Sequence, residues 1–116
     1  LTGSLVNAGA IIKYLRNLNP AKVSLVAMGY RASVSAEEDL LCAEILRSGL
    51  AGDDRSYKEN INNLRLGSGS RFFIPGNIDF SPPTDFFLCT MLNRFDFILR
   101  GERRFDNNID LVQIEV

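Results

Sequence analysis

The sequence contains no histidine. This absence excludes Ser-His-Asp and Cys-His catalysis and every histidine-ligated metal site within these residues. The glycine loops that usually bind nucleotides, GxxxxGK[ST] and GxGxxG, are also missing. Neither cysteine has an arginine six residues further on, the spacing of cysteine-dependent phosphatases. The remaining chemistry is that of carboxylates, hydroxyls, amides and arginines, which suits a hard cation such as Mg²⁺ and an oxyanion substrate.

The sequence also has no excess of positive or negative charge. Thirteen Lys+Arg against fourteen Asp+Glu give a net charge of -1, so no basic field favours nucleic acid as a partner. Cys42 and Cys89 lie in apolar patterns without CxxC spacing, which predicts buried free thiols in a reducing, cytoplasmic compartment. No apolar run approaches the roughly 18 residues that span a bilayer, so no membrane partner is expected.

The first half of the chain alternates helix and strand signals. Apolar residues at helical spacing predict a helix over 5–18, which Pro20 ends. The nearly continuous apolar run "KVSLVAMG" (22–29) is typical of a strand covered on both faces. A second helix is expected to start with a capping box of Ser35 and Glu38 and to run to about Leu50.

The second half begins with a more polar helix, capped by Ser56 and Glu59 and closed by Gly67. The segment 67–85 has the Gly, Ser and Pro content of a loop, although Phe72, Phe73 and Phe80 should pack on the body. A compact helix follows over "DFFLCTMLNRF", with Phe86, Cys89, Met91 and Leu92 inside. "FDFILR" and "IDLVQIEV" alternate as the strands of an antiparallel hairpin.

This order predicts an α/β fold: three α/β/α layers around a mixed sheet. The length of 116 residues suits one compact domain. The sequence begins "LTGSLVN", without a methionine and within a structural pattern that has already started. We therefore expect it to be a piece of a larger protein.

Three consecutive acids, Glu37, Glu38 and Asp39, follow the end of the expected strand, where ligands of open α/β sheets gather. Acids in a first helical turn are also stabilised by the helix dipole alone. Successive helical residues point about 100° apart, so the three cannot all face one ligand. We expect Glu37 to be solvated, Glu38 to serve mainly in the capping box, and Asp39 to face a site.

Candidate anion-binding groups lie nearby in the sequence. Gly3, Ser4 and Asn7 stand at a helix start, where free backbone N–H groups attract anions, although simple capping by Ser4 is the alternative. Arg31 follows the expected strand and could bind phosphate or sulfonate bidentately, or be a solvated loop residue. We expect Cys42 to be buried and inert.

The segments "GSLVNAGAI", "AMG", "SAEEDLLCAE" and "DFFLCTMLNRFDFILR" together resemble the C-terminal half of 2-phosphosulfolactate phosphatases. The resemblance covers nearly the whole chain and is weakest at 53–70 and after 101. It implies a Mg²⁺-dependent phosphatase of α/β fold that releases sulfolactate and phosphate on the route to coenzyme M, with Glu38 and Asp39 as metal ligands. The family's N-terminal half, which carries an aspartate- and arginine-containing segment and an Asn-Gly-Thr segment, is absent from this sequence.

We therefore expect residues 1–116 to be the C-terminal half of such an enzyme, inactive alone and partnered by the N-terminal half. Its substrate would be a small phosphorylated sulfo-acid or a related phosphorylated hydroxy acid. The catalytic nucleophile is unknown, and a homodimer stays open. The alternative is a non-enzymatic regulatory or oligomerising α/β module whose acids only begin a helix.

Overall fold

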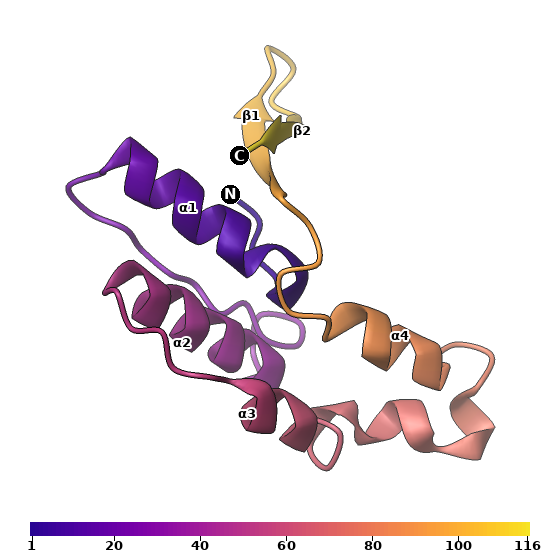
Figure 1. The fold of residues 1–116 in the computed structure, drawn as a ribbon. Coiled ribbons are helices and arrows are strands. Elements are labelled where there is room, and N and C mark those ends of the chain that lie inside the picture. Colours follow the sequence, from indigo (N-terminus) through magenta and orange to yellow (C-terminus); the bar gives the residue numbers. More distant parts are fainter.

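The computed structural model describes all residues from Leu1 to Val116. In chain order its elements are η1 (Leu5–Asn7), α1 (Ala8–Leu18), α2 (Glu37–Leu50), α3 (Lys58–Asn63), η2 (Ser68–Phe73), η3 (Pro75–Asn77), α4 (Pro83–Cys89), β1 (Phe97–Arg103) and β2 (Ile109–Glu115), where η marks a 3₁₀ helix. α1 and α2 lie side by side, the β1–β2 hairpin projects at one end, and the segment from η2 to α4 projects at the other (Figure 1). None of the helices is long and apolar enough to cross a membrane.

α1 forms as its apolar spacing predicts. Ala8, Ala10 and Ile11 are buried on one face. The helix ends where Asn19 adopts the left-handed conformation, with φ 47° and ψ 53°, immediately before Pro20. Asparagine tolerates this conformation better than most residues, and the following proline cannot continue the helix.

α2 also forms, but the predicted capping box at its start was wrong. The residue before the helix is Ala36, and no side chain caps this end. Ser35 therefore stands one position too early to accept from the first turn. The three acids still occupy the first turn, where the helix dipole favours them.

The predicted buried strand at 22–29 was wrong as well. Residues 22–28 run extended without strand pairing and take part in no backbone–backbone hydrogen bond. Val26 and Met28 are 75% and 65% exposed. The only sheet is the two-stranded β1–β2 hairpin, so no strand edge lies beside this segment to pair with it. The fold is thus a small α/β arrangement with an antiparallel pair, not the three layers expected.

The middle of the chain is more helical than a loop. Ser56 does not cap α3 as predicted: Tyr57 precedes the helix, and the Ser56 hydroxyl accepts only a long 3.4 Å bond from the Lys58 N–H. Two 3₁₀ helices, η2 and η3, occupy the predicted loop. Short i→i+3 turns of this kind suit a connector rich in glycine and proline.

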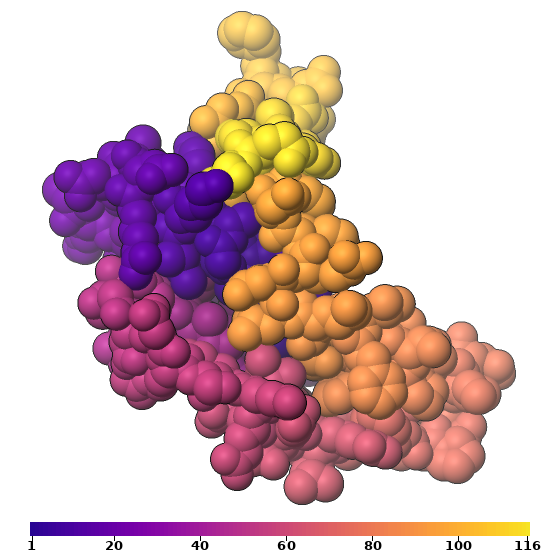
Figure 2. Space-filling view, in the orientation of Figure 1, coloured from indigo at the N-terminus to yellow at the C-terminus, as the bar shows by residue number.

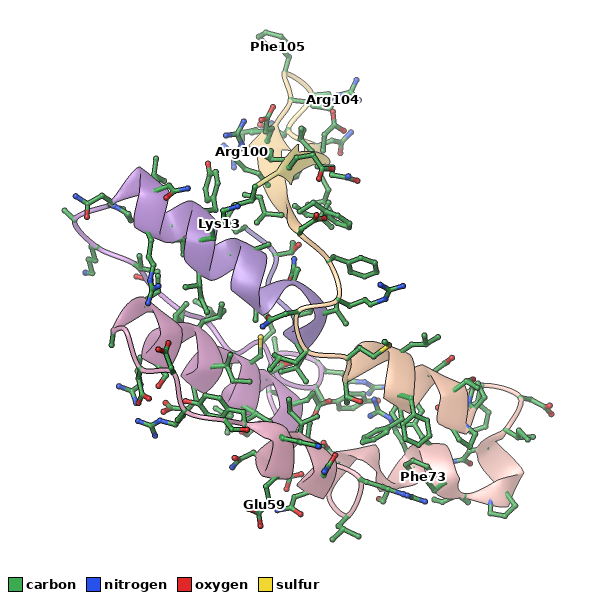
Figure 3. All side chains as sticks on the ribbon, viewed as in Figure 1. Lys13, Glu59, Phe73, Arg100, Arg104 and Phe105 are labelled. Carbon is green, nitrogen blue, oxygen red and sulfur yellow. The ribbon has the colours of Figure 1, made fainter.

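The aromatic cluster confirms part of the expected packing. Phe86 of α4 is buried and lies 6.1 Å from Phe72 and 5.3 Å from Phe73, between ring centroids. Phe73 lies in this cluster beneath α4 (Figure 3). Phe80 is 72% exposed, contrary to expectation. Cys89 and Met91 are exposed too, because α4 ends at Cys89, earlier than predicted, and is covered on one face only.

The C-terminal hairpin is confirmed. β1 pairs antiparallel with β2, from Phe97 opposite Glu115 to Arg103 opposite Ile109. Its base is fixed to the helices: the Thr2 N–H donates to the Leu99 carbonyl at 3.0 Å, and Lys13 Nζ of α1 donates to the Val116 carbonyl at 3.0 Å. Its tip, marked by Phe105, points away from the body (Figure 3).

The core lies where α1, α2 and the base of β1 meet, so residues near both ends of the chain share it. Ile98 of β1 is fully buried and belongs to the same apolar cluster as Ile11 and Leu46. The space-filling view shows the first residues packed against the last ones, with the α2–α3 residues along the other side of α1 (Figure 2). This packing fixes Leu1–Ser4 against the start of α2, where the candidate site is found.

Candidate functional site

Asp39 stands where three surface hollows meet. It lines a large apolar hollow, a smaller one of about 280 Å³ and a third, open one of about 450 Å³. Its Oδ2 accepts a hydrogen bond from the Gly29 N–H at 2.7 Å. Gly29 has φ +68°, and a Cβ there would overlap the Val34 carbonyl, so only glycine fits this turn. The second oxygen of Asp39 has no protein donor, which leaves it available to a ligand.

Glu38 lines the two smaller hollows beside Asp39. Its Oε2 is buried and has no hydrogen-bond partner. A buried carboxylate oxygen without a donor is costly. Because Ser35 does not form the expected capping box, Glu38 has no capping role, and its side chain is free to bind a cation.

Glu37 is exposed, as predicted, but its carboxylate also makes a contact with the protein. Its Oε2 accepts a hydrogen bond from the Ser68 N–H at 2.9 Å. A Cβ at Gly67 would strike the same carboxylate, so glycine at that position permits the close approach. Glu37 therefore fastens the start of η2 to the start of α2, and this contact closes one side of the site.

The 280 Å³ hollow joins distant parts of the sequence. Gly3 and Ser4 come from the N-terminal turn, Glu38 and Asp39 from α2, and Arg71 from η2. Ser68 and Thr90 add hydroxyl groups to the lining, and Phe72 and Phe86 form its apolar floor. The hollow thus offers two carboxylates, hydroxyls and one guanidinium, a set that can bind a cation and an oxyanion together.

Only some of the predicted anion-binding residues line the 280 Å³ hollow. Gly3 and Ser4 line the hollow. Asn7 is buried, its Oδ1 accepts from the Ser4 N–H at 3.0 Å and the Ser4 hydroxyl at 3.1 Å, and its Nδ2 donates to the Thr2 carbonyl at 3.4 Å. Its amide thus shapes the turn that holds Ser4. Arg31 stacks 5.2 Å over the Tyr30 ring and lines none of the three hollows.

Ser68 and Arg71 of this hollow were not predicted as site residues. Both line the 280 Å³ and 450 Å³ hollows. The sequence signal was an arginine within the glycine- and serine-rich run "GSGSRFF", where no other charged residue occurs. That run looked like a loop far from α2, and only the tertiary contact through Glu37 brings it to the acids.

Cys42 behaves as predicted. It is buried, with 9% exposure. Burial, and to a smaller extent the charge of Asp39, raises the pKa of the Cys42 thiol from 9.0 to about 11. A thiol that stays protonated at neutral pH is a poor nucleophile, so Cys42 contributes packing to the hollow.

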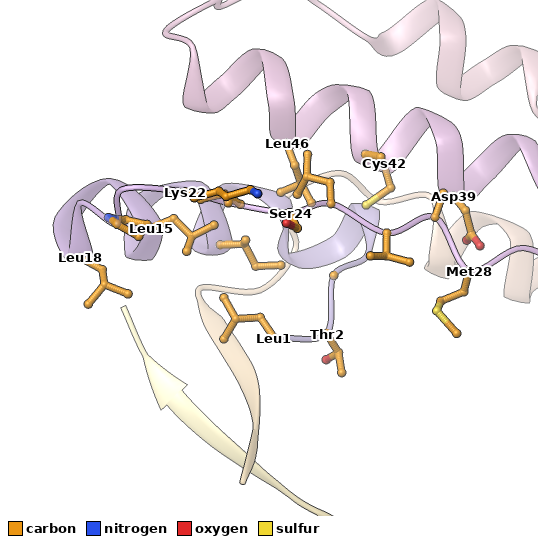
Figure 4. A pocket seen from close by; sticks show the side chains of 18 residues that line it. Leu1, Thr2, Leu15, Leu18, Lys22, Ser24, Met28, Asp39, Cys42 and Leu46 are labelled. Carbon is orange, nitrogen blue, oxygen red and sulfur yellow. The ribbon is translucent and has the colours of Figure 1, made fainter.

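The largest hollow, of about 630 Å³, lies between the N-terminal residues, α1, α2 and the extended segment 22–28 (Figure 4). Its lining is mainly apolar, with Lys22 toward one end and Asp39 at the other (Figure 4). It meets the 280 Å³ hollow at Gly3, Asp39 and Cys42, which line both. Asp39 therefore lies at the junction of these two hollows.

The donor set can be tested against the Mg²⁺ ion that the resemblance implies. No group of three or more His, Cys, Asp or Glu residues is gathered anywhere in the structure. Mg²⁺, however, is commonly held by one or two carboxylates together with water and substrate phosphate. The unpartnered Oε2 of Glu38 beside Asp39 fits this pattern.

The family model for 2-phosphosulpholactate phosphatase matches residues 1–66, which contain the N-terminal turn, α1 and the acids of α2. Comparisons with curated proteins and with solved structures gave no match. The match covers more than half of the 116 residues. The chain therefore belongs to the 2-phosphosulpholactate phosphatase family.

Proposed function

We propose that this chain forms one wall of the active site of a Mg²⁺-dependent phosphatase. The reaction is hydrolysis of the phosphate monoester of 2-phosphosulfolactate, or of a related phosphorylated hydroxy acid, as in coenzyme M synthesis. The observation that carries the proposal is the unpartnered carboxylate oxygen of Glu38 beside Asp39. It lies in a hollow lined also by Ser4 and Arg71, within a chain of the phosphatase family.

Glu38 and Asp39 are the residues that would hold Mg²⁺. When bound, the ion supplies charge neutralisation for the phosphoryl oxygens. Asp39 is oriented by the Gly29 N–H, so its free oxygen keeps one direction. The Ser4 hydroxyl donates to Asn7 Oδ1 at 3.1 Å, and Ser4 lines the hollow, so its oxygen can accept a hydrogen bond from a bound water.

The proposal assigns no nucleophile to this chain, because the Cys42 thiol is buried and protonated. We infer that the family's N-terminal half supplies the remaining catalytic groups. Support comes from residues 22–28, whose apolar side chains are exposed and whose backbone groups are unpaired. Such a surface is stabilised when another strand covers it. A homodimer is the other arrangement that would cover it.

The test is isothermal titration of residues 1–116 with inorganic phosphate, with and without Mg²⁺. A site wall binds phosphate weakly and only when Mg²⁺ is present. No binding under either condition would favour the alternative, a regulatory or oligomerising module in which the acids merely begin α2. Binding that is independent of Mg²⁺ would retain an anion site but remove the metal from the proposal.

A further inference from the structure

Arg71 is the one cationic residue that lines the two smaller hollows. No carboxylate lies within ion-pair distance of its guanidinium, whereas Arg47, Arg55, Arg100 and Arg104 are all paired with acids. A guanidinium left unpaired in a hollow next to two carboxylates has its hydrogen-bonding capacity available for a ligand.

The structure also holds Arg71 in place. Its guanidinium carbon stacks 4.9 Å over the centroid of the Phe72 ring. Its carbonyl accepts from Asn77 Nδ2 at 3.0 Å, and its segment is fastened to α2 through the Ser68 N–H bond to Glu37. A guanidinium placed in advance loses less freedom when it binds an anion.

We propose that Arg71 binds the anionic end of the substrate that is not transferred, the sulfonate or carboxylate of the sulfolactate portion. This inference rests on the proposed function, in which the phosphoryl group lies at Glu38 and Asp39. Two carboxylates repel an oxyanion in the absence of a cation, and Mg²⁺ held by Glu38 and Asp39 would supply the charge that favours the phosphoryl group there. The sulfonate and carboxylate then lie away from the metal, and the planar guanidinium of Arg71 can bind one of them bidentately.

Arg65 offers a matched control. It too stacks on an aromatic ring, with its guanidinium carbon 4.1 Å over the Phe73 centroid, and it too has no acidic partner within ion-pair distance. It lines none of the three hollows. Loss of Arg65 therefore removes the same charge and a similar stacking contact from the same region without touching the site.

The experiment titrates residues 1–116 and its variants with two separate probes, sulfolactate and inorganic phosphate, both with Mg²⁺ present. Arg71→Met should weaken sulfolactate binding by about tenfold or more, the effect of losing a charge-assisted hydrogen bond. It should leave phosphate binding within about twofold. Arg71→Lys keeps the positive charge but loses the planar guanidinium, so its sulfolactate affinity should lie between those of wild type and Arg71→Met. Arg65→Met should change neither affinity.

Circular dichroism and thermal unfolding establish whether each variant is folded. If Arg71→Met does not fold, Arg71→Lys is compared with wild type instead. Unchanged sulfolactate affinity in the folded Arg71 variants would overturn the inference. An equal loss of sulfolactate and phosphate binding would also overturn it, because Arg71 would then bind the phosphoryl group. Wild-type protein that binds phosphate but not sulfolactate overturns this inference alone, whereas wild type that binds neither probe removes the proposed function as well.

Discussion

Asp39 Oδ2 accepts a hydrogen bond from the Gly29 N–H at 2.7 Å. This bond joins the first turn of α2 to the end of the extended segment 22–28. It places the acids beyond the carboxyl end of that segment, where ligands of α/β folds bind, although no sheet surrounds the segment in this chain. The position of Asp39 thus depends on a side-chain contact across ten residues.

The segment 22–28 provides the first prediction. Because it makes no backbone–backbone hydrogen bond, its amides should exchange with solvent at nearly the rates of an unstructured peptide. Amides in the middle of α2 should exchange far more slowly. Hydrogen exchange followed by NMR at low protein concentration measures both. Strong protection of 22–28 would show that another strand already covers it.

Gly69 should be intolerant of a side chain. A Cβ there would collide with the Phe86 ring and lie 2.7 Å from the Leu64 carbonyl oxygen. Gly69→Ala should therefore lower the free energy of unfolding by about 1–3 kcal/mol, as overpacking does. Chemical denaturation measures the change.

The control for Gly69 is Gly76→Ala in η3. Nothing lies within 4 Å of a Cβ at Gly76, and its φ is not positive. The change should stay within about 0.5 kcal/mol, as surface substitutions usually do. Equal effects of the two substitutions would mean that η2 does not pack on α4 as described.

The two cysteines should differ in reactivity. At pH 8 a thiol reagent should label exposed Cys89 quickly and buried Cys42 only after unfolding. The pKa of the Cys42 thiol is about 11 in the folded chain and 9.0 as its ordinary value. The unfolded chain therefore loses this proton first, so Cys42 should lower the stability as pH rises from about 9 to 11. Cys42→Ala should remove that part of the pH dependence, and rapid labelling of Cys42 in the native state would contradict its burial.

Residues 1–116 alone should show no useful phosphatase turnover. A site completed by a second half loses most of its positioning when that half is missing. A phosphate-release assay with 2-phosphosulfolactate and Mg²⁺ measures this directly. Substantial Mg²⁺-dependent release by this chain alone would show that every catalytic group lies within it.

Patterns of neighbouring residues predicted most of the helices and both strands. The apolar spacing of Ile11 and Leu15, the acids that begin α2, and the alternation of β1 and β2 are properties of neighbouring residues, and each element formed. The buried strand at 22–29 failed for a physical reason: a strand exists only when another backbone pairs with it. Apolar sequence favours such pairing but cannot supply the partner.

The site could be predicted only in part for the same reason. Asp39 was predicted to face a site from its place after an apolar run, and it lines the three hollows. The predicted capping role of Glu38 was wrong, because Ser35 lies two residues before the first residue of the helix. The contact of Glu37 was missed, because its partner Ser68 is 31 residues away. Arg71 was missed because its proximity to α2 depends on that long-range contact.

Asp39 and Glu38 are proposed to form the cation-binding wall of a phosphatase site. The most direct measurement is the Mg²⁺-dependent affinity of residues 1–116 for inorganic phosphate in Asp39→Asn, with Glu37→Gln as the matched control. An asparagine at position 39 can still accept from the Gly29 N–H, and a glutamine at position 37 can still accept from the Ser68 N–H, so both variants should fold. We predict that Asp39→Asn weakens the Mg²⁺-dependent binding by about tenfold or more, while Glu37→Gln changes it by less than about twofold, a few tenths of a kcal/mol. Unchanged Mg²⁺-dependent binding in Asp39→Asn would show that these acids only begin α2 and do not bind the cation.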